Sequence, residues 1–438
     1  MPAPIRFHAP CPRGLESLLA DELRALGATI LAQPGGGVRF EGDAAIGMAV
    51  NLHSRLASRV LREVSQCEYR DERDLYHLAL DTPWEQWHDA VATVRIDVTA
   101  TRSPLQSLHF AMQRIKDGVV DRHREHSGER PSIDTHRPDR RIFAHLDAHW
   151  ATLYLDWSGE ALFKRGWRRE GFEAPLKENL AAGLLGLAGW TPDQPLFDPF
   201  CGSGTVLIEA ADIASGRPPG ARRKFAFERI RDFDLRRWSQ IREPSNASAM
   251  IARGPWGGRA GRAPIVGSDI SVAAIAAAQN NLAAANLPAD AVQLRQLDIL
   301  HLESAPDDHG LVVTNPPYGE RLELGGRQSL AQADRFWPAF ATLLKQRFTG
   351  WSACLLTSDP MLPKRMRLAE TRRTPLFNGA IECRLFRFEI YAGSKHRTNP
   401  ENASAEPPVS PLAPVVPATS ATHGPSQPPE PSGSSLPQ

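Results

Sequence analysis

The stretch LFDPFCGSGTVLIEAADIA, residues 196–214, decides the fold of the chain around it. An apolar run ends at Asp198, a glycine-containing loop follows, and apolar residues then recur at helical spacing. This order predicts a strand, a tight turn and a helix. Ligands of doubly wound sheets bind beyond the carboxyl ends of the strands, and glycine lets a backbone come close to a ligand. An ordinary strand–helix turn is the alternative.

Strands and helices alternate on both sides of this stretch, roughly from 171 to 393. The pattern predicts an α/β fold with a Rossmann-like, doubly wound and mostly parallel sheet. The loop is neither G-x-x-x-x-G-K-[ST] nor G-x-G-x-x-G, so it does not match the common phosphate-binding loops. A carboxylate beside the glycines suits instead a ligand that carries an amino group and a positive sulfonium.

Two more acids follow strands of the same sheet. Asp269, in GSDI, ends the second strand, where a carboxylate can accept the ribose hydroxyls of a nucleoside. It lies 71 residues after Asp198, but without the 46 residues of 217–262 the interval is 25, near the usual spacing of about 20. Asp298, in QLDIL, ends the third strand and could accept a bond from an adenine amine. Each acid alone is more often a helix cap or loop residue, but three at successive strand ends indicate a nucleoside site.

The fourth strand ends in VVTNPPYGERL, residues 312–322. Two consecutive prolines stop a strand because neither has an N–H to donate. The Asn315 oxygen and the Pro316 carbonyl can then both accept N–H bonds from the exocyclic amine of a base, and Tyr318 offers a ring for stacking. Two acceptors aim the amine lone pair at an electrophile without a strong general base. A plain proline-capped strand end is the alternative.

The segment 217–262 interrupts the alternation between the first two strand–helix units. It contains 12 Lys and Arg against 4 acids, with aromatic residues interleaved. One hypothesis is a surface that binds RNA phosphates and exposed bases. The alternative is a solvated variable loop.

The part before 158 reads as α+β, with strands, a helix over 14–28 and a second basic amphipathic helix over 44–64. The net charge of the 438 residues is +1, so no global field attracts nucleic acid. The five cysteines have no paired spacing, and the first residues contain no apolar signal segment. We therefore expect a cytoplasmic protein without disulfides.

Residues 196–205 and 312–319 resemble motifs I and IV of class I S-adenosylmethionine-dependent methyltransferases that act on amino nitrogens. Three further stretches narrow the resemblance to the THUMP-containing bacterial 23S ribosomal RNA guanine-N2 methyltransferases of the RlmL type. They are CPRGLESLLADEL, LFKRGWRREGFEAPLKENLAAGLL and NGAIECRLFRFEI. The resemblance implies a ferredoxin-like segment at 1–65, an RNA-binding THUMP domain at 66–157 and a methyltransferase domain at 158–393. Some relatives carry a second methyltransferase domain that makes 7-methylguanine. Here we expect a disordered, Pro/Ser-rich tail at 394–438 and do not assign that second activity.

The resemblance also implies S-adenosylmethionine as cofactor and, as target, a guanine N2 amine of 23S rRNA, free or in a large-subunit precursor. The expected cofactor contacts are Asp198, Pro199, Phe200, Cys201, Gly202, Ser203, Gly204, Thr205, Asp269, Ile270, Asp298 and Asn315, and the expected catalytic residues are Asn315, Pro316, Pro317 and Tyr318. Cys201 is interpreted as a small packed residue, because an amine target needs no cysteine nucleophile. We expect a monomer with no metal and no membrane partner.

Other functions stay open at this point. The same motif serves enzymes that methylate adenine N6 in DNA or RNA, guanine N2 of tRNA, or a protein glutamine amide. A non-catalytic RNA-binding assembly factor could keep the same fold. A nicotinamide oxidoreductase is disfavoured by the missing G-x-G-x-x-G.

Overall fold

The computed structural model describes residues 4–169, 176–243, 263–316 and 328–391. The chain divides into two units, Met1–Gly393 and Ser394–Gln438. The second unit, with the expected tail, lies outside the described residues. The first unit contains two seven-stranded sheets.

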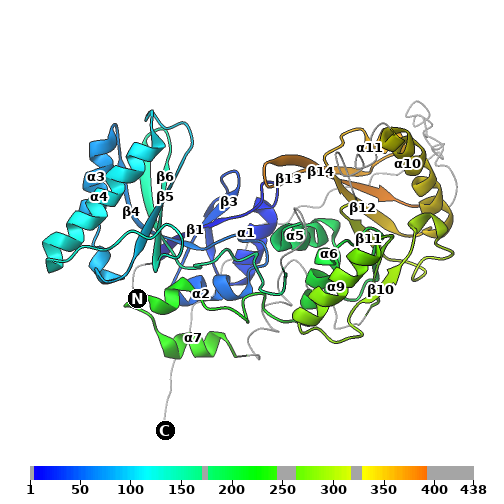
Figure 1. Cartoon of the computed structure of the whole chain (residues 1–438), viewed down its shortest axis with the longest axis horizontal. Helices are drawn as coiled ribbons and strands as arrows, with labels where there is room; N and C mark the ends of the chain where they lie inside the picture. Colours follow the sequence, from blue (N-terminus) through cyan, green and yellow to red (C-terminus); the bar gives the residue numbers. More distant parts are fainter. Residues whose placement is uncertain (1–3, 170–175, 244–262, 317–327, 392–438) are drawn as a thin grey trace, which may run out of the picture. The chain divides into compact units, whose positions relative to one another are not determined.

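The first sheet has the order β2-β3-β1-β4-β7-β6-β5 and is mostly antiparallel, with one parallel pair, β5 and β6. Its strands are β1 (Ile5–Pro10), β2 (Thr29–Ala32), β3 (Gly37–Gly42), β4 (Leu61–Glu68), β5 (Val94–Ala100), β6 (Arg140–Leu146) and β7 (Trp150–Asp156). Its helices are α1 (Glu16–Ala25), α2 (Ala44–His53), α3 (Glu72–Asp81) and α4 (Leu108–Ser127), and a 3-10 turn, η1, spans Trp84–Gln86 (Figure 1). Alternate strand residues form one apolar cluster with helix residues, among them Phe7, Phe40, Leu19, Leu75 and Ile115. The expected boundary at 65/66 falls inside β4.

The helix predicted over 44–64 is wrong beyond His53. Helix α2 ends there because Ser54 turns to an extended backbone. The Ser54 hydroxyl and the Arg55 amide both donate to the buried carboxylate of Glu22, at 2.6 and 2.7 Å. Because Glu22 is remote in sequence from Ser54, the helical spacing of apolar residues did not indicate that the helix ends at His53.

The second sheet has the order β10-β9-β8-β11-β12-β14-β13. Strands β8 (Leu196–Asp198), β9 (Ile265–Asp269), β10 (Gln293–Gln296), β11 (Leu311–Thr314) and β12 (Ser352–Thr357) are parallel, whereas β14 (Ile381–Glu389) runs antiparallel between β12 and β13 (Arg372–Asn378). The order reverses between β8 and β11, the first and fourth strands. This confirms the predicted doubly wound sheet, and the reversal marks the expected ligand position.

Helices cover both faces of this sheet (Figure 1). Residues Leu196, Leu311 and Val313 pack in a cluster with α5 (Glu178–Ala188) and α6 (Thr205–Ala214), and helix α9 (Val272–Ala284) contacts β9 and β10. Residues Phe197 and Val312 face the other way, toward α10 (Gln328–Arg347) and α11 (Leu362–Met366). A 3-10 turn, η3 (Ile299–His301), follows β10. No helix in the described ranges is long and apolar enough to cross a membrane.

Residues 217–243 are the described part of the basic insertion, and we call them the strap. They include η2 (Ala226–Arg229) and α7 (Leu235–Ile241). Arg217 and Arg222 donate to the carbonyls of Ala285 (3.0 Å) and Ala284 (3.1 Å), at the C-terminus of α9. A cation is favourable there because the last carbonyls of a helix lack partners.

The strap also packs against the part of the chain that contains the first sheet. Arg223 donates to the carbonyls of Ala161 (2.8 Å) and Glu160, shortly after β7, and α7 contacts α2. Three of the strap's four aromatic side chains are buried: Phe225 and Trp238 are each 2% exposed and Phe227 is 0% exposed, whereas Phe233 is half-buried. These buried rings are not available to stack on RNA bases, and they contribute to the core of the protein instead. The expected contact of the strap's exposed cations with RNA phosphates stays a prediction. Trp256 and the rest of 244–262 lie outside the described residues.

Candidate active site

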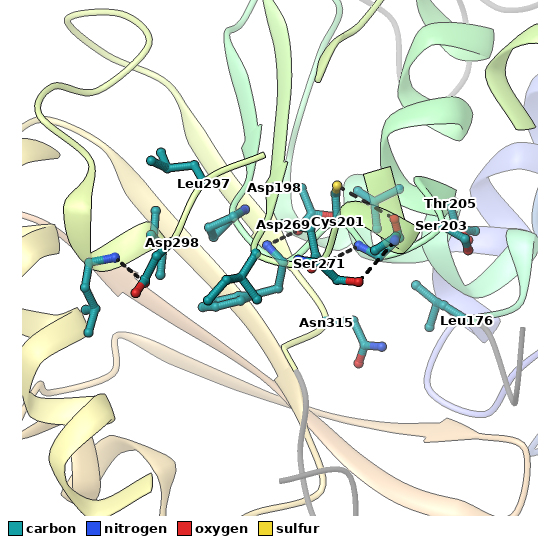
Figure 2. A pocket seen from close by; sticks show the side chains of 18 of the residues that line it. Leu176, Asp198, Cys201, Ser203, Thr205, Asp269, Ser271, Leu297, Asp298 and Asn315 are labelled. Atoms are coloured by element: carbon teal, nitrogen blue, oxygen red, sulfur yellow. Dashed lines mark hydrogen bonds between the residues drawn. The ribbon is translucent and has the colours of Figure 1, made fainter. Parts of the chain in front are cut away.

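A cavity of about 620 Å³ lies at the carboxyl ends of β8, β9, β10 and β11. Its size is typical of sites for small molecules and cofactors. Figure 2 shows Asp298 at one end of the hollow and Leu176 and Thr205 at the other. Every charged residue that lines it in the described part of the chain is an acid, namely Asp198, Asp269 or Asp298.

The cavity brings together most of the residues predicted from sequence. Those that line it are Asp198, Pro199, Phe200, Cys201, Gly202, Ser203, Thr205, Asp269, Ile270, Asp298 and Asn315. Two do not line it, Gly204 and Pro316. Pro317 and Tyr318 lie outside the described residues. The contacts of the lining residues with cofactor or substrate stay predictions.

Gly204 serves helix packing, and its expected cofactor contact stays a prediction. Its φ is +81°, a conformation that side-chain-bearing residues rarely adopt. A Cβ there would also lie 3.1 Å from the Cβ of Ala278 on α9. Gly204 therefore lets the loop turn into α6 while α6 and α9 approach closely.

Asp198 is 2% exposed and has no ion-pair partner among the described residues. Its Oδ1 accepts from the hydroxyl of Thr314 at 2.6 Å and from the amide of Phe200 at 3.2 Å. Burial raises the pKa of Asp198 to about 7, the Thr314 bond lowers it in part, and the nearby charge of Asp269 raises it further. A buried carboxylate without a cation is costly, so this side chain is suited to meet a positively charged group of a ligand.

The other two acids are more exposed and fix local turns. Asp269 Oδ2 accepts from the amide of Gly202 at 3.0 Å, and its Oδ1 accepts from the amide of Ser271 at 2.9 Å. Asp298 Oδ1 accepts from the amide of Leu300 at 3.0 Å. Each carboxylate oxygen can accept more than one bond, so both groups keep acceptor capacity for a ligand.

Asn315 follows β11 directly and lines the same cavity. Its Oδ1 atom is buried and has no hydrogen-bond partner among the residues that the structure describes. Leaving a buried acceptor unpaired costs about 1–3 kcal/mol. An N–H group that entered the cavity would satisfy this oxygen.

Sequence reasoning missed several residues of the site. Thr314 links β11 to Asp198, and its signal was a hydroxyl at the end of an otherwise apolar strand, directly before Asn315. Leu176, Leu297, Phe336 and Trp337 supply apolar wall. Phe336 comes from α10, stacks on Phe340 with ring centroids 5.9 Å apart, and meets Phe200 edge-on. Nothing in the spacing of α10 separated these rings from ordinary core residues.

Cys201 lines the cavity but is 6% exposed. Burial raises the pKa of its thiol, and the charges of Asp198 and Asp269 raise it further. A thiolate nucleophile is disfavoured in such surroundings. The structure agrees with the interpretation of Cys201 as a packed residue.

Comparison with known families identifies this arrangement. A family model described as an RMKL-like methyltransferase domain matches residues 165–387. The chain belongs to this methyltransferase family. An RlmL ferredoxin-like domain matches 6–61 and a THUMP domain matches 69–156, which confirms the resemblance drawn from the motifs.

Individual relatives extend the comparison. A ribosomal RNA large subunit methyltransferase K/L of Syntrophotalea carbinolica is 40% identical, and the match covers 89% of this chain but 54% of that protein. A putative RNA methyltransferase of Synechocystis is 35% identical, with 88% of this chain and 97% of that protein covered. This chain thus spans about half the length of the K/L relatives.

Solved structures described as methyltransferases or methylases have the same fold. A putative methyltransferase complexed with SAH superposes with a TM-score of 0.77 at 26% identity, over 90% of this chain and 100% of that one. A predicted N6-adenine-specific DNA methylase from Listeria monocytogenes has a TM-score of 0.75 at 28% identity, over 89% and 97%.

Proposed function

We propose that this chain methylates the exocyclic N2 amine of a guanine in the 23S RNA of the large ribosomal subunit. The K/L relatives and the THUMP match support RNA as substrate. The cofactor is S-adenosylmethionine, as family membership and the SAH-bound relative indicate. When bound, it supplies an electrophilic methyl group.

The charge and the volume of the cavity support this cofactor. In this proposal Asp198 accepts from the cofactor's ammonium, and Asp269 accepts from its ribose hydroxyls. Asp298 and the apolar wall of Leu297 and Phe336 suit the adenine. Three carboxylates around one cavity also favour a ligand with a positive sulfonium.

The observation that carries the proposal is the unpartnered, buried Oδ1 of Asn315. An exocyclic amine is a donor whose lone pair is delocalised into the base ring. When Asn315 holds one of its hydrogens, the nitrogen becomes more tetrahedral and its lone pair points away from the ring. Asn315 therefore stabilises the transition state more than the ground state, and the amine loses its extra proton to water.

Replacing Asn315 by Ala should abolish this stabilisation. We expect the single-turnover rate of methyl transfer to fall about 10²–10³-fold, with cofactor and RNA binding retained. The matched control is Gln293→Ala, which removes an exposed amide from β10, outside the cavity. If Asn315→Ala transfers methyl groups at the wild-type rate, the amine is held elsewhere.

The identity of the methylated base needs its own experiment. Labelled cofactor is offered with 23S rRNA, tRNA and genomic DNA, and the products are digested and separated as nucleosides. We expect N2-methylguanosine from 23S rRNA. Label in N6-methyladenine would instead support the activity named for the Listeria relative, and label in tRNA would reassign the substrate.

A further inference from the structure

The cofactor has one negative group, and the lining of the cavity offers it no cation. S-adenosylmethionine carries a sulfonium, an ammonium and a carboxylate. The three charged lining residues of the described chain are all acids. The carboxylate of the cofactor therefore needs a hydrogen-bond donor in the lining that is polarised by a cation outside the lining.

Arg168 is such a cation. Its Nη2 donates to the Thr205 hydroxyl at 3.1 Å and to the Leu176 carbonyl at 2.9 Å. Both of these residues line the cavity, at the end opposite Asp298 (Figure 2). Since the adenine is assigned to the Asp298 end, the methionine part of the cofactor reaches Thr205.

The bond from Arg168 also decides what Thr205 can do. A hydroxyl has one hydrogen to donate and lone pairs to accept with. Because Arg168 occupies the oxygen as a donor, the hydroxyl hydrogen of Thr205 is free to point toward an acceptor in the cavity. A hydroxyl group whose oxygen accepts a hydrogen bond from a cation is also a stronger hydrogen-bond donor to an anion.

Arg168 is itself held firmly but not fully satisfied. Glu178 accepts from its Nε at 3.0 Å, and the ring of Trp167 lies 5.0 Å from its guanidinium carbon. Its Nη1 is buried and has no hydrogen-bond partner within the described part of the chain. The position of the side chain is thus fixed by Glu178, Leu176 and Thr205, while one donor stays unsatisfied.

We propose that Arg168 is a positioning residue that turns the Thr205 hydroxyl into a donor to the carboxylate of the bound cofactor. The inference rests on the cofactor and not on the base that is methylated. It can therefore fail while the proposed function stands, and the reverse also holds.

The test removes the carboxylate from the ligand as well as the arginine from the protein. Binding of S-adenosylmethionine and of its decarboxylated analogue is measured by calorimetry on the full chain without RNA. In Arg168→Met we expect affinity for S-adenosylmethionine to fall about tenfold, and affinity for the decarboxylated analogue to change less than about twofold. Arg169→Met, at the exposed neighbouring position, should change neither.

Variants of Thr205 complete the test. Thr205→Val should reproduce the selective loss, and Thr205→Ser should restore normal discrimination between the two ligands. Adding Arg168→Met to Thr205→Val should cause little further loss, because both act on one bond. Equal loss of both ligands in Arg168→Met would mean that the arginine only supports the fold, and unchanged affinity for both would remove it from the site.

Discussion

At the scale of single residues, the site keeps polar groups that stability alone would not select. Asp198 is buried beside Asp269 with a hydroxyl and an amide as partners, and Asn315 keeps an unpaired oxygen. Such groups cost free energy in the protein without ligand and are compensated when a ligand supplies the missing charge or donor. Both hydrogen bonds to Asp198 end on the same oxygen, Oδ1, so the amide oxygen of an asparagine in its place could accept both of them.

Replacing Asp198 by Asn should therefore stabilise the protein at high pH. The pKa of Asp198 is raised from 3.8 to about 7 in the folded chain, so the folded state binds a proton that the unfolded state has lost. Wild-type stability then falls as the pH rises through this window, and the full cost is present above it. We expect Asp198→Asn to gain on the order of 2–4 kcal/mol at pH 8 and almost nothing near pH 4.

Urea unfolding of both forms between pH 4 and pH 8 measures this difference. The variant should also bind S-adenosylmethionine at least about tenfold more weakly at pH 8, since its amide cannot match the ammonium charge. A stability gain that does not grow with pH would contradict the assigned titration.

At the scale of elements, guanidinium groups connect segments that lack regular contacts. The strap arginines donate to backbone carbonyls at the end of α9 and in the 160–164 turn. Burial lowers the pKa of Arg223 to about 10, since its charge is held among carbonyls rather than in water. Three of the strap's cations, Arg217, Arg222 and Arg223, therefore connect segments of the fold.

Arg223 and its neighbour Lys224 make a matched pair for testing this role. Arg223→Ala should lower the free energy of unfolding by about 1–2 kcal/mol, because it removes a half-buried guanidinium and leaves the partly buried carbonyl of Ala161 without this donor. Lys224→Ala, at an exposed position, should stay within about 0.5 kcal/mol.

Salt dependence separates this structural role from RNA binding. Arg223→Ala should not change the slope of log affinity against log salt for RNA, because Arg223 is engaged within the protein. A shallower slope in Arg223→Ala would return this arginine to the RNA surface.

At the scale of the whole first unit, a buried ionic cluster joins the region before β4 to helix α6. Glu209 on α6 is 1% exposed and lies 3.2 Å from Arg165 Nε and 3.7 Å from Arg55 Nη1. Arg55 also reaches Asp212 at 3.2 Å. Because α6 begins at Thr205, the cluster fixes the helix that follows the glycine loop.

Glu209→Gln should reveal how much this ionic cluster contributes to the free energy of unfolding. Removing one partner of a buried ion pair typically costs about 3–5 kcal/mol, since the remaining charge is left uncompensated. The control is Asp21→Asn, which breaks the exposed pair with Arg24 and should cost less than about 0.5 kcal/mol. The midpoint of urea unfolding measures both, and similar midpoints for the two variants would contradict the role of the cluster.

The sequence was sufficient for the second sheet and the acids at its strand ends. Short apolar strands with a glycine loop have few folded solutions, and parallel strands place Asp198, Asp269 and Asn315 at one edge. The sequence was not sufficient where a partner is remote. No local pattern encodes the bonds to Glu22 that accompany the end of α2 at His53. The same holds for the carbonyl partners of Arg223 and for the bond from Arg168 to Thr205, which all depend on tertiary contacts.

The place where the strap leaves the second sheet affects how such chains are recognised. Helix α6 runs from the cavity edge of the sheet back to the opposite edge, and the chain between α6 and β9 begins there, far from the cofactor. Residues can be added at that edge without moving either carboxylate. A search profile that fixes the interval between the two acids would pass over this chain, whereas one that counts successive strand ends would retrieve it.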